Sequence, residues 1–331
     1  MKKDKWHPGR LLEVSGSYWL TCALHTGVKL DVFTVIGRAQ VSGKDAAEKV
    51  QGDERGTVTL LNALAAAGLL EKQGDLFSNT PESYQFLSKT SPDYLGFMIM
   101  HHHHLMASWN RLDEAVIQGQ PVRGRSAHQS DETRESFLMG MFNIGMMTAP
   151  KAADAIDLSG KKTLLDIGGG PGTFAIHFCL KNPDLKAVVY DLPATRPFAE
   201  KTIARFGLND RVAFCDGDFV EKPIEGRFDA AWLSHILHGE SPDDCQKIIK
   251  KAVAALNPGG IIGIHEFILN NAADGPLFPA LFSLNMLTGT SEGRAYTEAQ
   301  LTDMLGNAGV KDIQRLEFNT PNDSGIITGA V

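Results

Sequence analysis

The 331-residue sequence has few cysteines and no long apolar run, and each absence excludes a class of protein. Its four cysteines, Cys22, Cys179, Cys215 and Cys245, are scattered and form no CxxC pair. This spacing argues against a disulfide framework and favours free thiols in a reducing compartment. No apolar segment reaches the length that spans a bilayer, and no apolar signal core follows residues 1–5. We therefore expect a cytoplasmic protein that does not associate with membranes.

An excess of positive charge is also missing. The 32 Lys and Arg residues are outnumbered by 39 Asp and Glu residues, which gives a formal net charge of −7. A protein that binds the phosphate backbone normally presents a basic face, so this balance argues against a nucleic-acid partner. Hydrophobic residues make up 43% of the chain, enough for a sizeable core, and the length suggests two domains.

The first hundred residues predict a helical domain with one small hairpin. Apolar residues keep helical spacing over 11–30, and a short helix is expected over 45–50. A longer helix follows over 54–68 and ends at a glycine, and two strands then flank the turn within 69–77. Helix, turn, helix and hairpin together predict a winged-helix domain.

A winged helix offers two functions, DNA binding or packing against another subunit. Arg55 is the only basic residue of the second helix, whereas a recognition helix needs groups that reach phosphates and bases. We therefore favour subunit packing, and a ligand-sensing DNA-binding regulator remains the alternative.

A helical segment over 101–157 is expected to link the two halves of the chain. Its second part contains four methionines, Met139, Met141, Met146 and Met147. Methionines at such positions pack in a core or form a deformable pocket wall.

From residue 163 onward, strands alternate with helices. This order predicts a parallel, doubly wound α/β sheet of the Rossmann-like kind. The expected strands cover 164–167, 187–190, 212–214, 228–233, 260–266, 313–318 and 326–330, and the expected helices cover 174–180, 197–206, 243–256 and 297–309.

A glycine-rich turn lies directly between the first strand and helix of this half. A dinucleotide fingerprint that starts at Gly168 and continues at Gly170 would need its third glycine at Thr173, but the glycine falls one place earlier, at Gly172. With an acid, Asp166, two residues before the first glycine, this spacing suits S-adenosylmethionine better than a nicotinamide dinucleotide. Glycines allow the backbone to turn sharply and to approach a ligand closely.

Acidic residues follow the next two strands. Asp191 can accept hydrogen bonds from both ribose hydroxyls, although a helix cap is the alternative. Asp218 can accept from an adenine amino group, and Phe219 can stack on the ring, unless the two form only a surface turn. Ligands of open α/β sheets bind at the carboxyl ends of the strands, where all these residues are expected.

Two histidines follow the fourth strand. An imidazole at this edge can act as a general base, because its pKa is near neutral. We assign this function to His238, with Glu266 orienting the ring and stabilising its cation, and we expect His235 to be structural.

Taken together, these motifs resemble the class I small-molecule O-methyltransferases typified by plant caffeate and hydroxyindole (acetylserotonin) O-methyltransferases and their bacterial relatives. The resemblance covers nearly the whole chain. Besides the winged-helix start and the glycine turn, it rests on Met106-Ala107-Ser108-Trp109, Phe142–Met146, Asp191-Leu192-Pro193, Gly217-Asp218-Phe219, Leu237-His238, Asn257–Gly260 and Thr297-Glu298.

The resemblance implies methyl transfer from S-adenosylmethionine to a hydroxyl of a small, aromatic acceptor, by a homodimer paired through its N-terminal domain. It implies a winged-helix dimerisation domain over 1–100, a helical linker that contributes to the acceptor pocket over 101–157, and a donor-binding domain over 158–331. The residues implied in donor binding are Gly168, Gly170, Asp191, Leu192, Asp218, Phe219 and Ser234. Those implied in acceptor binding are Ile99, Met100, Phe142, Met146 and Met286. His238 and Glu266 match the catalytic base and one of its two flanking acids.

The sequence departs from the family pattern at two positions near the expected base. Gly239 stands where the family often has Asp, and Ala295 stands at the second flanking acid, although the nearby Glu292 offers a substitute. These changes weaken the support for an imidazolium, so methylation at nitrogen, sulfur or carbon stays an alternative.

Four successive histidines, 101–104, form an unusual run. Successive side chains of a helix point about 100° apart, so four of them cannot converge on one metal ion. One of them could still join the other pocket histidines, but we expect solvated or acceptor-contacting imidazoles and no metal.

Overall fold

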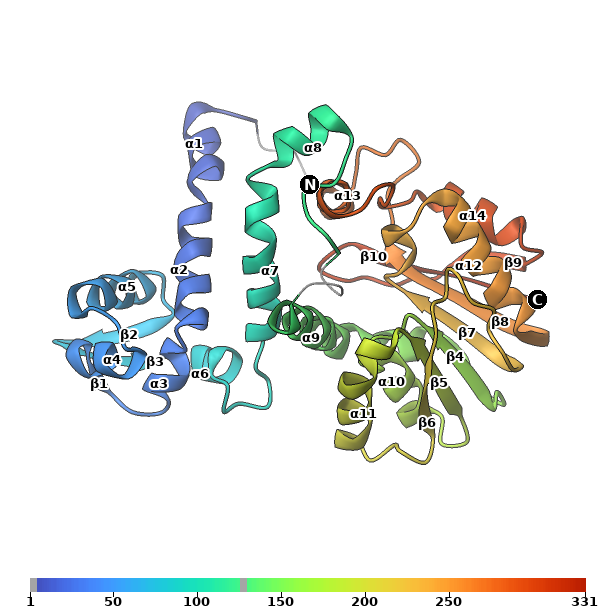
Figure 1. Ribbon diagram of the computed structural model, residues 1–331, viewed down its shortest axis with the longest axis horizontal. Helices are drawn as coiled ribbons and strands as arrows, with labels where there is room; N and C mark the ends of the chain where they lie inside the picture. The colour runs from blue at the N-terminus through green and yellow to red at the C-terminus, as the bar shows by residue number, and fades with distance from the viewer. Residues whose placement is uncertain (1–4, 126–129) are drawn as a thin grey trace. The chain divides into compact units, whose positions relative to one another are not determined.

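The computed structural model describes residues 5–125 and 130–331, and the chain divides into two compact units, Met1–His104 and Leu105–Val331 (Figure 1). In both units the predicted elements are present within a few residues of the expected bounds. No helix in the described parts of the chain combines the length and apolar character that a bilayer crossing needs.

The N-terminal unit contains the expected helices and hairpin. Its small sheet has the order β1-β3-β2, with β2 and β3 antiparallel around a turn at Gly74. Val28, Phe33, Leu61, Leu64 and Phe77 form the centre of its core. The elements are α1 (Pro8–Gly16), α2 (Tyr18–Lys29), α3 (Val32–Ile36), β1 (Val41–Ser42), α4 (Gly43–Val50), α5 (Glu54–Ala66), β2 (Leu70–Gln73), β3 (Leu76–Asn79) and α6 (Pro81–Leu87).

The helix α7 spans Gly96–Trp109 and contains the histidine run, so it begins before residue 101, where the helical segment was expected to start. Its apolar residues are spread around the whole circumference rather than along one stripe, so no helical period marks its beginning. His103 contacts the ring of the buried His25 at 5.6 Å, and Lys29 Nζ lies 3.2 Å from His103 Nε2. Burial, together with the neighbouring His103 and His102, lowers the pKa of His25 to about 4.

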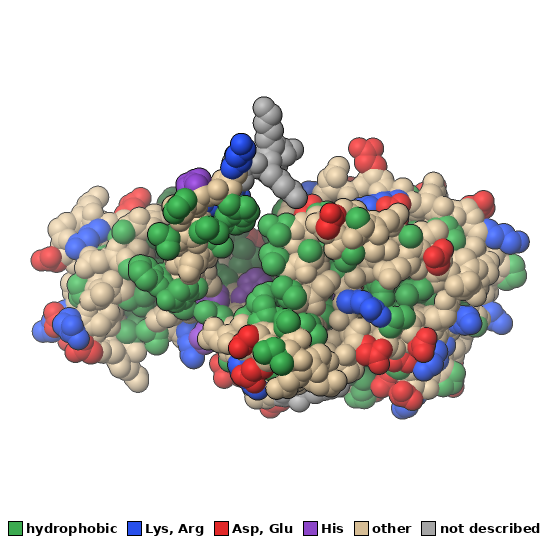
Figure 2. Space-filling view, turned by 90° about the horizontal axis from the view of Figure 1, so that it is seen from above, with side chains coloured by type: hydrophobic (Ala, Val, Ile, Leu, Met, Phe, Trp, Pro, Cys, Tyr) green, Lys and Arg blue, Asp and Glu red, His purple; other side chains and the backbone are tan. Residues whose placement is uncertain are grey.

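Helices α1 and α2 leave large apolar side chains on the surface. Leu12 is 73% exposed and Trp19 is 71% exposed, and further exposed residues are Leu11, Val14, Tyr18 and Leu20, with Trp6 just before α1. Figure 2 shows hydrophobic side chains gathered on the surface over this unit. Contiguous apolar surface of this kind marks a contact face for another macromolecule.

The C-terminal unit is built on a seven-stranded sheet of order β6-β5-β4-β7-β8-β10-β9. The pairs from β6 to β8 are parallel, as the alternating pattern predicts, whereas β10 is antiparallel to both β8 and β9. The expectation of a fully parallel sheet is therefore wrong for β10. This strand follows β9 along the chain without the crossover helix that a parallel neighbour needs. The strands are β4 (Thr163–Ile167), β5 (Lys186–Asp191), β6 (Val212–Asp216), β7 (Phe228–Ser234), β8 (Leu256–Phe267), β9 (Lys311–Arg315) and β10 (Ser324–Ala330).

Helices cover both faces of this sheet. Apolar residues of α9, α10 and α11 form one core with β4 and β5, and residues of α12 and α14 form another with β7 and β8. The carboxyl ends of β4, β5, β6 and β7 thus meet at one edge, where the site lies. The helices are α8 (Leu112–Gln118), α9 (Asp131–Ala155), α10 (Thr173–Lys181), α11 (Arg196–Arg205), α12 (Pro242–Ala254), α13 (Leu277–Gly289) and α14 (Glu298–Gly306), with short 3₁₀ turns η2 (Pro193–Thr195) and η3 (Leu237–Gly239).

Candidate donor and catalytic site

The glycine turn after β4 has the backbone that its sequence requires. Gly168 and Gly170 have φ values of +64° and +54°, a region that side chains disfavour. A Cβ at position 168 would overlap the side chain of Ile236 and lie 3.3 Å from the ring of Phe219. The bare backbone at this turn therefore brings the loop, the aromatic ring and the segment after β7 together.

Asp191, at the end of β5, is hydrogen-bonded to the backbone of this turn. Its Oδ2 accepts from the Gly170 N–H at 2.8 Å, and its Oδ1 accepts from the Leu192 N–H at 2.6 Å and from the Thr195 hydroxyl at 3.2 Å. The side chain is buried, which raises its pKa, and these hydrogen bonds partly oppose the rise. Each carboxylate oxygen has two lone-pair directions, so Oδ1 is fully used and Oδ2 can still accept one ribose hydroxyl.

Asp218 and Phe219 follow β6 on the same edge. One oxygen, Asp218 Oδ1, accepts from the N–H groups of Val220 and Glu221 at 2.9 and 3.1 Å, so the carboxylate shapes its own turn. Gly217 packs against the ring of Tyr190, and a Cβ there would overlap that ring. Asp218 Oδ2 is left to accept from a ligand, while Phe219 flanks the glycine turn.

Two further polar side chains lie behind this edge. Asp166 is fully buried, and burial is the main reason why its pKa rises to about 8. Its Oδ2 accepts from the Ala175 N–H at 3.2 Å, and a Cβ on Gly169 would overlap its carboxyl group. Ser234 Oγ, at the end of β7, lies 3.0 Å from His265 Nδ1, so its hydroxyl is engaged with the neighbouring strand.

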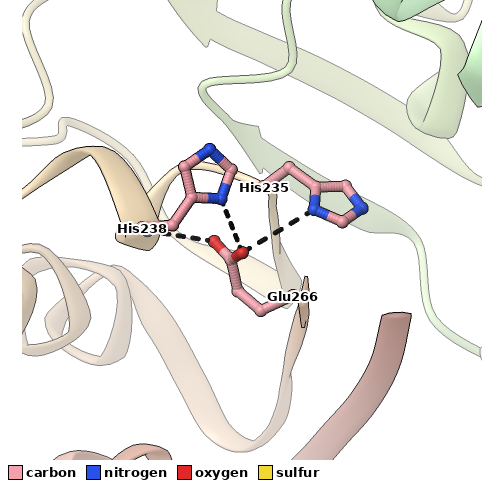
Figure 3. Close-up of side chains that lie close together, drawn as sticks. All are labelled: His235, His238 and Glu266. Carbon is pink, nitrogen blue, oxygen red and sulfur yellow. Dashed lines mark hydrogen bonds and ion pairs between the residues drawn. The ribbon is translucent and has the colours of Figure 1, made fainter. Parts of the chain in front are cut away.

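His238 and Glu266 meet as the sequence predicts (Figure 3). Glu266 lies near the end of β8, is 1% exposed, and places Oε2 2.7 Å from His238 Nδ1. Its other oxygen accepts from the N–H groups of Leu237 at 2.9 Å and His238 at 3.3 Å. Burial alone would raise the pKa of Glu266, but the charge and hydrogen bond of His238, together with the nearby His235, hold it well below its usual range. The carboxylate thus stays ionised and directs Nε2 of His238 away from itself.

His235 lies on the other side of the same carboxylate. Its Nδ1 is 3.6 Å from Glu266 Oε2 (Figure 3). Its ring packs 4.3 Å from both His265 and Phe267. Burial lowers its pKa, so the imidazole is uncharged near neutral pH. The residue has a φ of +56°, which is rare for a side chain of this size. His265 is fully buried between Ser234 and Ser324.

Three phenylalanines next to His238 were not anticipated from the sequence. Phe282 lies edge-on to the imidazole at 4.7 Å, Phe267 is stacked with it at 5.9 Å, and Phe278 contacts both phenylalanines. Phe278 and Phe282 come from α13, a helix that sequence reasoning did not assign. Their four-residue spacing within the apolar run 277–289 was the signal that could have identified the helix, although not the face that meets His238.

The residues expected to bind the acceptor fall into three groups. Ile99 and Met100 belong to α7 and pack against the core of the N-terminal unit. Phe142 lies 6.5 Å from the ring of Phe206, and Met146 Sδ lies 3.4 Å from His177 Nε2, so both contact the helix layer over β4 and β5. Met286 is buried on α13, the helix that carries Phe282. Only Met286 shares an element with a residue in contact with His238, and the acceptor role of all five stays a prediction.

The two departures from the family pattern have clear surroundings. Ala295 is buried, and Glu292 is exposed on the loop after α13. The carbonyl of Gly239 accepts a hydrogen bond from Arg125 Nη2 at 2.7 Å. Glu266 is therefore the acid that contacts His238, and an arginine contacts the position where the family often has Asp.

Among the described residues, one cluster has the composition of a metal site. One ligand atom each of His235, His238 and Glu266 lies within 4.8 Å of the others. Two imidazoles and a carboxylate are a ligand set that zinc accepts. The alternative is a hydrogen-bonded base with no metal, which the 2.7 Å contact between His238 and Glu266 already satisfies.

We predict that methyl transfer does not need this metal. Enzyme dialysed against excess EDTA should keep its full turnover, because the imidazole is oriented by the carboxylate alone. Turnover before and after dialysis is the measurement, with a zinc-dependent hydrolase treated in parallel as a control for chelation. Complete loss of turnover, restored by a single metal ion, would contradict the prediction.

The residues at this edge fit an adenosine-containing donor. The glycine turn leaves backbone free for close approach, Asp191 and Asp218 offer acceptors for hydroxyl and amino groups, and Phe219 offers a stacking surface. A Rossmann-like sheet with these groups and an imidazole next to them defines a class I methyltransferase, which takes its methyl group from S-adenosylmethionine.

Comparison with known proteins agrees with this class. Residues 109–311 match the model of the O-methyltransferase domain, and residues 12–89 match that of the O-methyltransferase dimerisation domain. The chain belongs to the O-methyltransferase family and is an S-adenosylmethionine-dependent enzyme. The resemblance found in its sequence is thereby confirmed.

Three relatives illustrate the range of the family. The 3-hydroxy-5-methyl-1-naphthoate 3-O-methyltransferase of Streptomyces sahachiroi is 31% identical over 97% of this chain and 95% of its own. The N,N-dimethyltransferase OxyT of Streptomyces rimosus is 29% identical over 79% of each chain. The crystal structure of human N-acetylserotonin methyltransferase in complex with SAM has 25% identity and a TM-score of 0.86, covering 100% of this chain and 99% of that one.

Proposed function

We propose that this enzyme methylates a phenolic hydroxyl of a small aromatic molecule, with His238 as the general base. The observation that carries the proposal is the 2.7 Å contact between His238 Nδ1 and the buried, ionised Glu266. This contact fixes the ring so that Nε2 is free to accept a proton. S-adenosylmethionine supplies an electrophilic methyl group when bound at the neighbouring sheet edge.

The acidity of a phenol explains why a base is useful here. A phenol has a pKa of about 10, so at neutral pH few molecules are in the nucleophilic phenolate form. An imidazole that takes the phenolic proton during attack corrects this, and a positioned base of this kind contributes ~10²–10⁴-fold. Glu266 stabilises the imidazolium that forms, as the acid of a triad does.

Aromatic side chains support a flat, aromatic acceptor. Phe267 and Phe282 contact the imidazole directly, and Phe278 is 41% exposed next to them. Aromatic rings prefer stacked or edge-on partners, so these residues favour an acceptor with fused or substituted rings. The naphthoate substrate named for the Streptomyces sahachiroi relative has this character.

An amine acceptor is the competing possibility, since one relative carries the name of an N,N-dimethyltransferase. A neutral amine already presents a lone pair and needs no base, so the His238–Glu266 pair favours a hydroxyl.

An acceptor screen tests the proposal. Purified protein is incubated with methyl-labelled S-adenosylmethionine and matched sets of naphthols, hydroxynaphthoates, hydroxyindoles and the corresponding arylamines. We expect label in a phenolic ether and faster turnover for phenols than for the matched amines. Exclusive labelling of the amines, or of carbon, would contradict hydroxyl methylation.

We also propose that the exposed apolar face of α1 and α2 pairs two copies of the chain. Residues 12–89 match a dimerisation domain, and this face carries Leu12 and Trp19 with most of their surface exposed. The cytoplasmic location expected from the sequence stays a prediction, as does the absence of a nucleic-acid or membrane partner.

A further inference from the structure

The segment 119–125, which we call the strap, is held to the rest of the C-terminal unit by arginine side chains and by its own backbone. Arg111 Nη1 donates to the carbonyl of Val122 at 2.9 Å. The N–H groups of Val122 and Arg123 both donate to the carbonyl of Thr288, at 3.0 and 3.1 Å, so the strap is fixed to the last turn of α13. None of these hydrogen bonds is internal to a helix or strand, and together they hold the strap in one place.

Arg123 inserts into the same helix end. Its Nη2 lies 3.4 Å from both the carbonyl and the side-chain oxygen of Asn285. A Cβ on Gly289 would lie 2.5 Å from the guanidinium carbon, so a glycine at that position makes room for the arginine. The strap is thereby joined to the helix that carries Phe278, Phe282 and Met286.

Arg125 continues from the strap to the turn that carries the base. Its two terminal nitrogens pair with the two carboxylate oxygens of Glu240, with Nη2–Oε2 at 3.0 Å, and Nη2 also donates to the carbonyl of Gly239 at 2.7 Å. The Glu240 side chain is only 9% exposed. The hydrogen bond with Glu240 raises the pKa of Arg125 although burial opposes this, and the charges of Asp218 and Asp244 add to the rise.

The turn 238–240 is restrained on its other sides as well. The Tyr296 hydroxyl donates to the carbonyl of Glu240 at 2.7 Å, and Cys245 Sγ lies 3.1 Å from the carbonyl of Leu237. A Cβ on Gly293 would overlap the carbonyl of His238. The position that lacks a side chain, Gly239, receives its hydrogen bond from Arg125.

We propose that Arg125 and Glu240 form a latch that fixes the base-bearing turn, and that Arg125 is a positioning residue for His238. The proposal rests on the proposed function of His238 and extends it. Glu266 sets the rotation of the imidazole, and the latch sets the backbone from which the imidazole projects. A bidentate arginine–carboxylate pair suits this purpose because its two parallel hydrogen bonds fix direction as well as distance.

The test compares R125A, R125K and E240Q with H238A and with the double variant R125A/H238A. Turnover is measured with 3-hydroxy-1-naphthoate or, if the unmodified enzyme does not methylate it, with the phenol that the acceptor screen returns. We expect R125A to lower kcat by roughly 10- to 10²-fold, the cost of a misplacement of about 1 Å at a reacting group. R125K should recover part of this loss, because lysine keeps the charge but not the fork.

Three readouts separate positioning from a general structural effect. Affinity for S-adenosylhomocysteine, measured by calorimetry, should be unchanged in R125A, and hydrogen exchange should increase in the 236–241 peptide. The R125A change should add no further loss in the H238A background, because it acts through the imidazole. K162A, which removes the exposed Lys162–Asp184 ion pair, is the matched control. It should change neither the affinity for S-adenosylhomocysteine, nor the hydrogen exchange of the 236–241 peptide, nor turnover.

The outcomes distinguish the latch from the base. If H238A loses turnover while R125A, R125K and E240Q match K162A, the base stands and the latch is wrong. If H238A keeps turnover, the base assignment fails and the latch, which acts through it, fails as well. If R125A proves too unstable to assay, E240Q decides, since it keeps the shape of Glu240 and removes only the charge.

Discussion

Replacing His238 with alanine should lower methyl transfer to a phenol by ~10² or more, while the donor binds as tightly as before. The side chain is 13% exposed and its Nδ1 is held by Glu266, so its one available function is at Nε2. Removing the ring takes away the proton acceptor without touching Asp191, Asp218 or the glycine turn. The measurements are kcat with a phenolic acceptor and the Kd of S-adenosylhomocysteine.

Glu266→Gln separates orientation from charge in the same pair. Interactions with His238 and His235 keep the pKa of Glu266 well below its usual value, so the carboxylate is ionised throughout the working pH range. Its contribution to stability is therefore present above the unfolded pKa and is lost only as the pH falls towards the low folded pKa. Glutamine keeps the size but cannot stabilise an imidazolium, so turnover should fall while the protein still binds the donor.

A matched control is available on the opposite layer of the same unit. His177 lies on α10, against Met146 and Phe206, and does not contact Glu266. His177→Ala should leave kcat close to that of the unmodified enzyme. If H238A and H177A have equal turnover, methyl transfer proceeds by proximity alone and the assignment of a base is wrong.

How far the sequence could predict this site depends on how local each signal is. Gly168, Asp191 and Asp218 follow strands directly, and parallel strands end at one edge, so topology alone brings these residues together. Glu266 follows the same logic, because β8 pairs with β7 and registers His265 beside Ser234. These expectations needed only the order of elements along the chain.

The residues that sequence reasoning missed depend on packing between distant segments. Arg125 meets Glu240 across 115 positions of the chain, and no periodicity in either segment indicates the pair. Phe282 reaches His238 only because α13 folds back over the end of β8, and α13 is apolar around its whole circumference. A helix without a polar face gives no direction to its side chains until its neighbours are known.

Asp191 is the residue whose loss should most weaken donor binding. Its buried carboxylate faces the glycine turn, and a hydrogen bond to a charged group contributes about 1.5–3 kcal/mol. One ribose hydroxyl on the lone-pair direction that Oδ2 has left would therefore account for roughly 10- to 10²-fold in affinity, at about 1.4 kcal/mol per factor of ten. Asp191→Ala should raise the Kd of S-adenosylhomocysteine by at least the lower of these factors.

Asp191→Asn and a pH series refine the argument. Asparagine keeps the shape, but its NH₂ end is a hydrogen-bond donor, so the side chain can no longer accept from both the Gly170 and Leu192 N–H groups. The affinity for the methyl donor should therefore fall here as well. Because burial raises the pKa of Asp191, donor affinity of the unmodified enzyme should weaken on acidification at a higher pH than for an exposed aspartate. The control is Asp184→Ala, which removes an exposed aspartate that pairs with Lys162. A Kd in Asp191→Ala equal to that of this control would show that the ribose binds elsewhere, and with it the placement of the donor along the strand ends would fall.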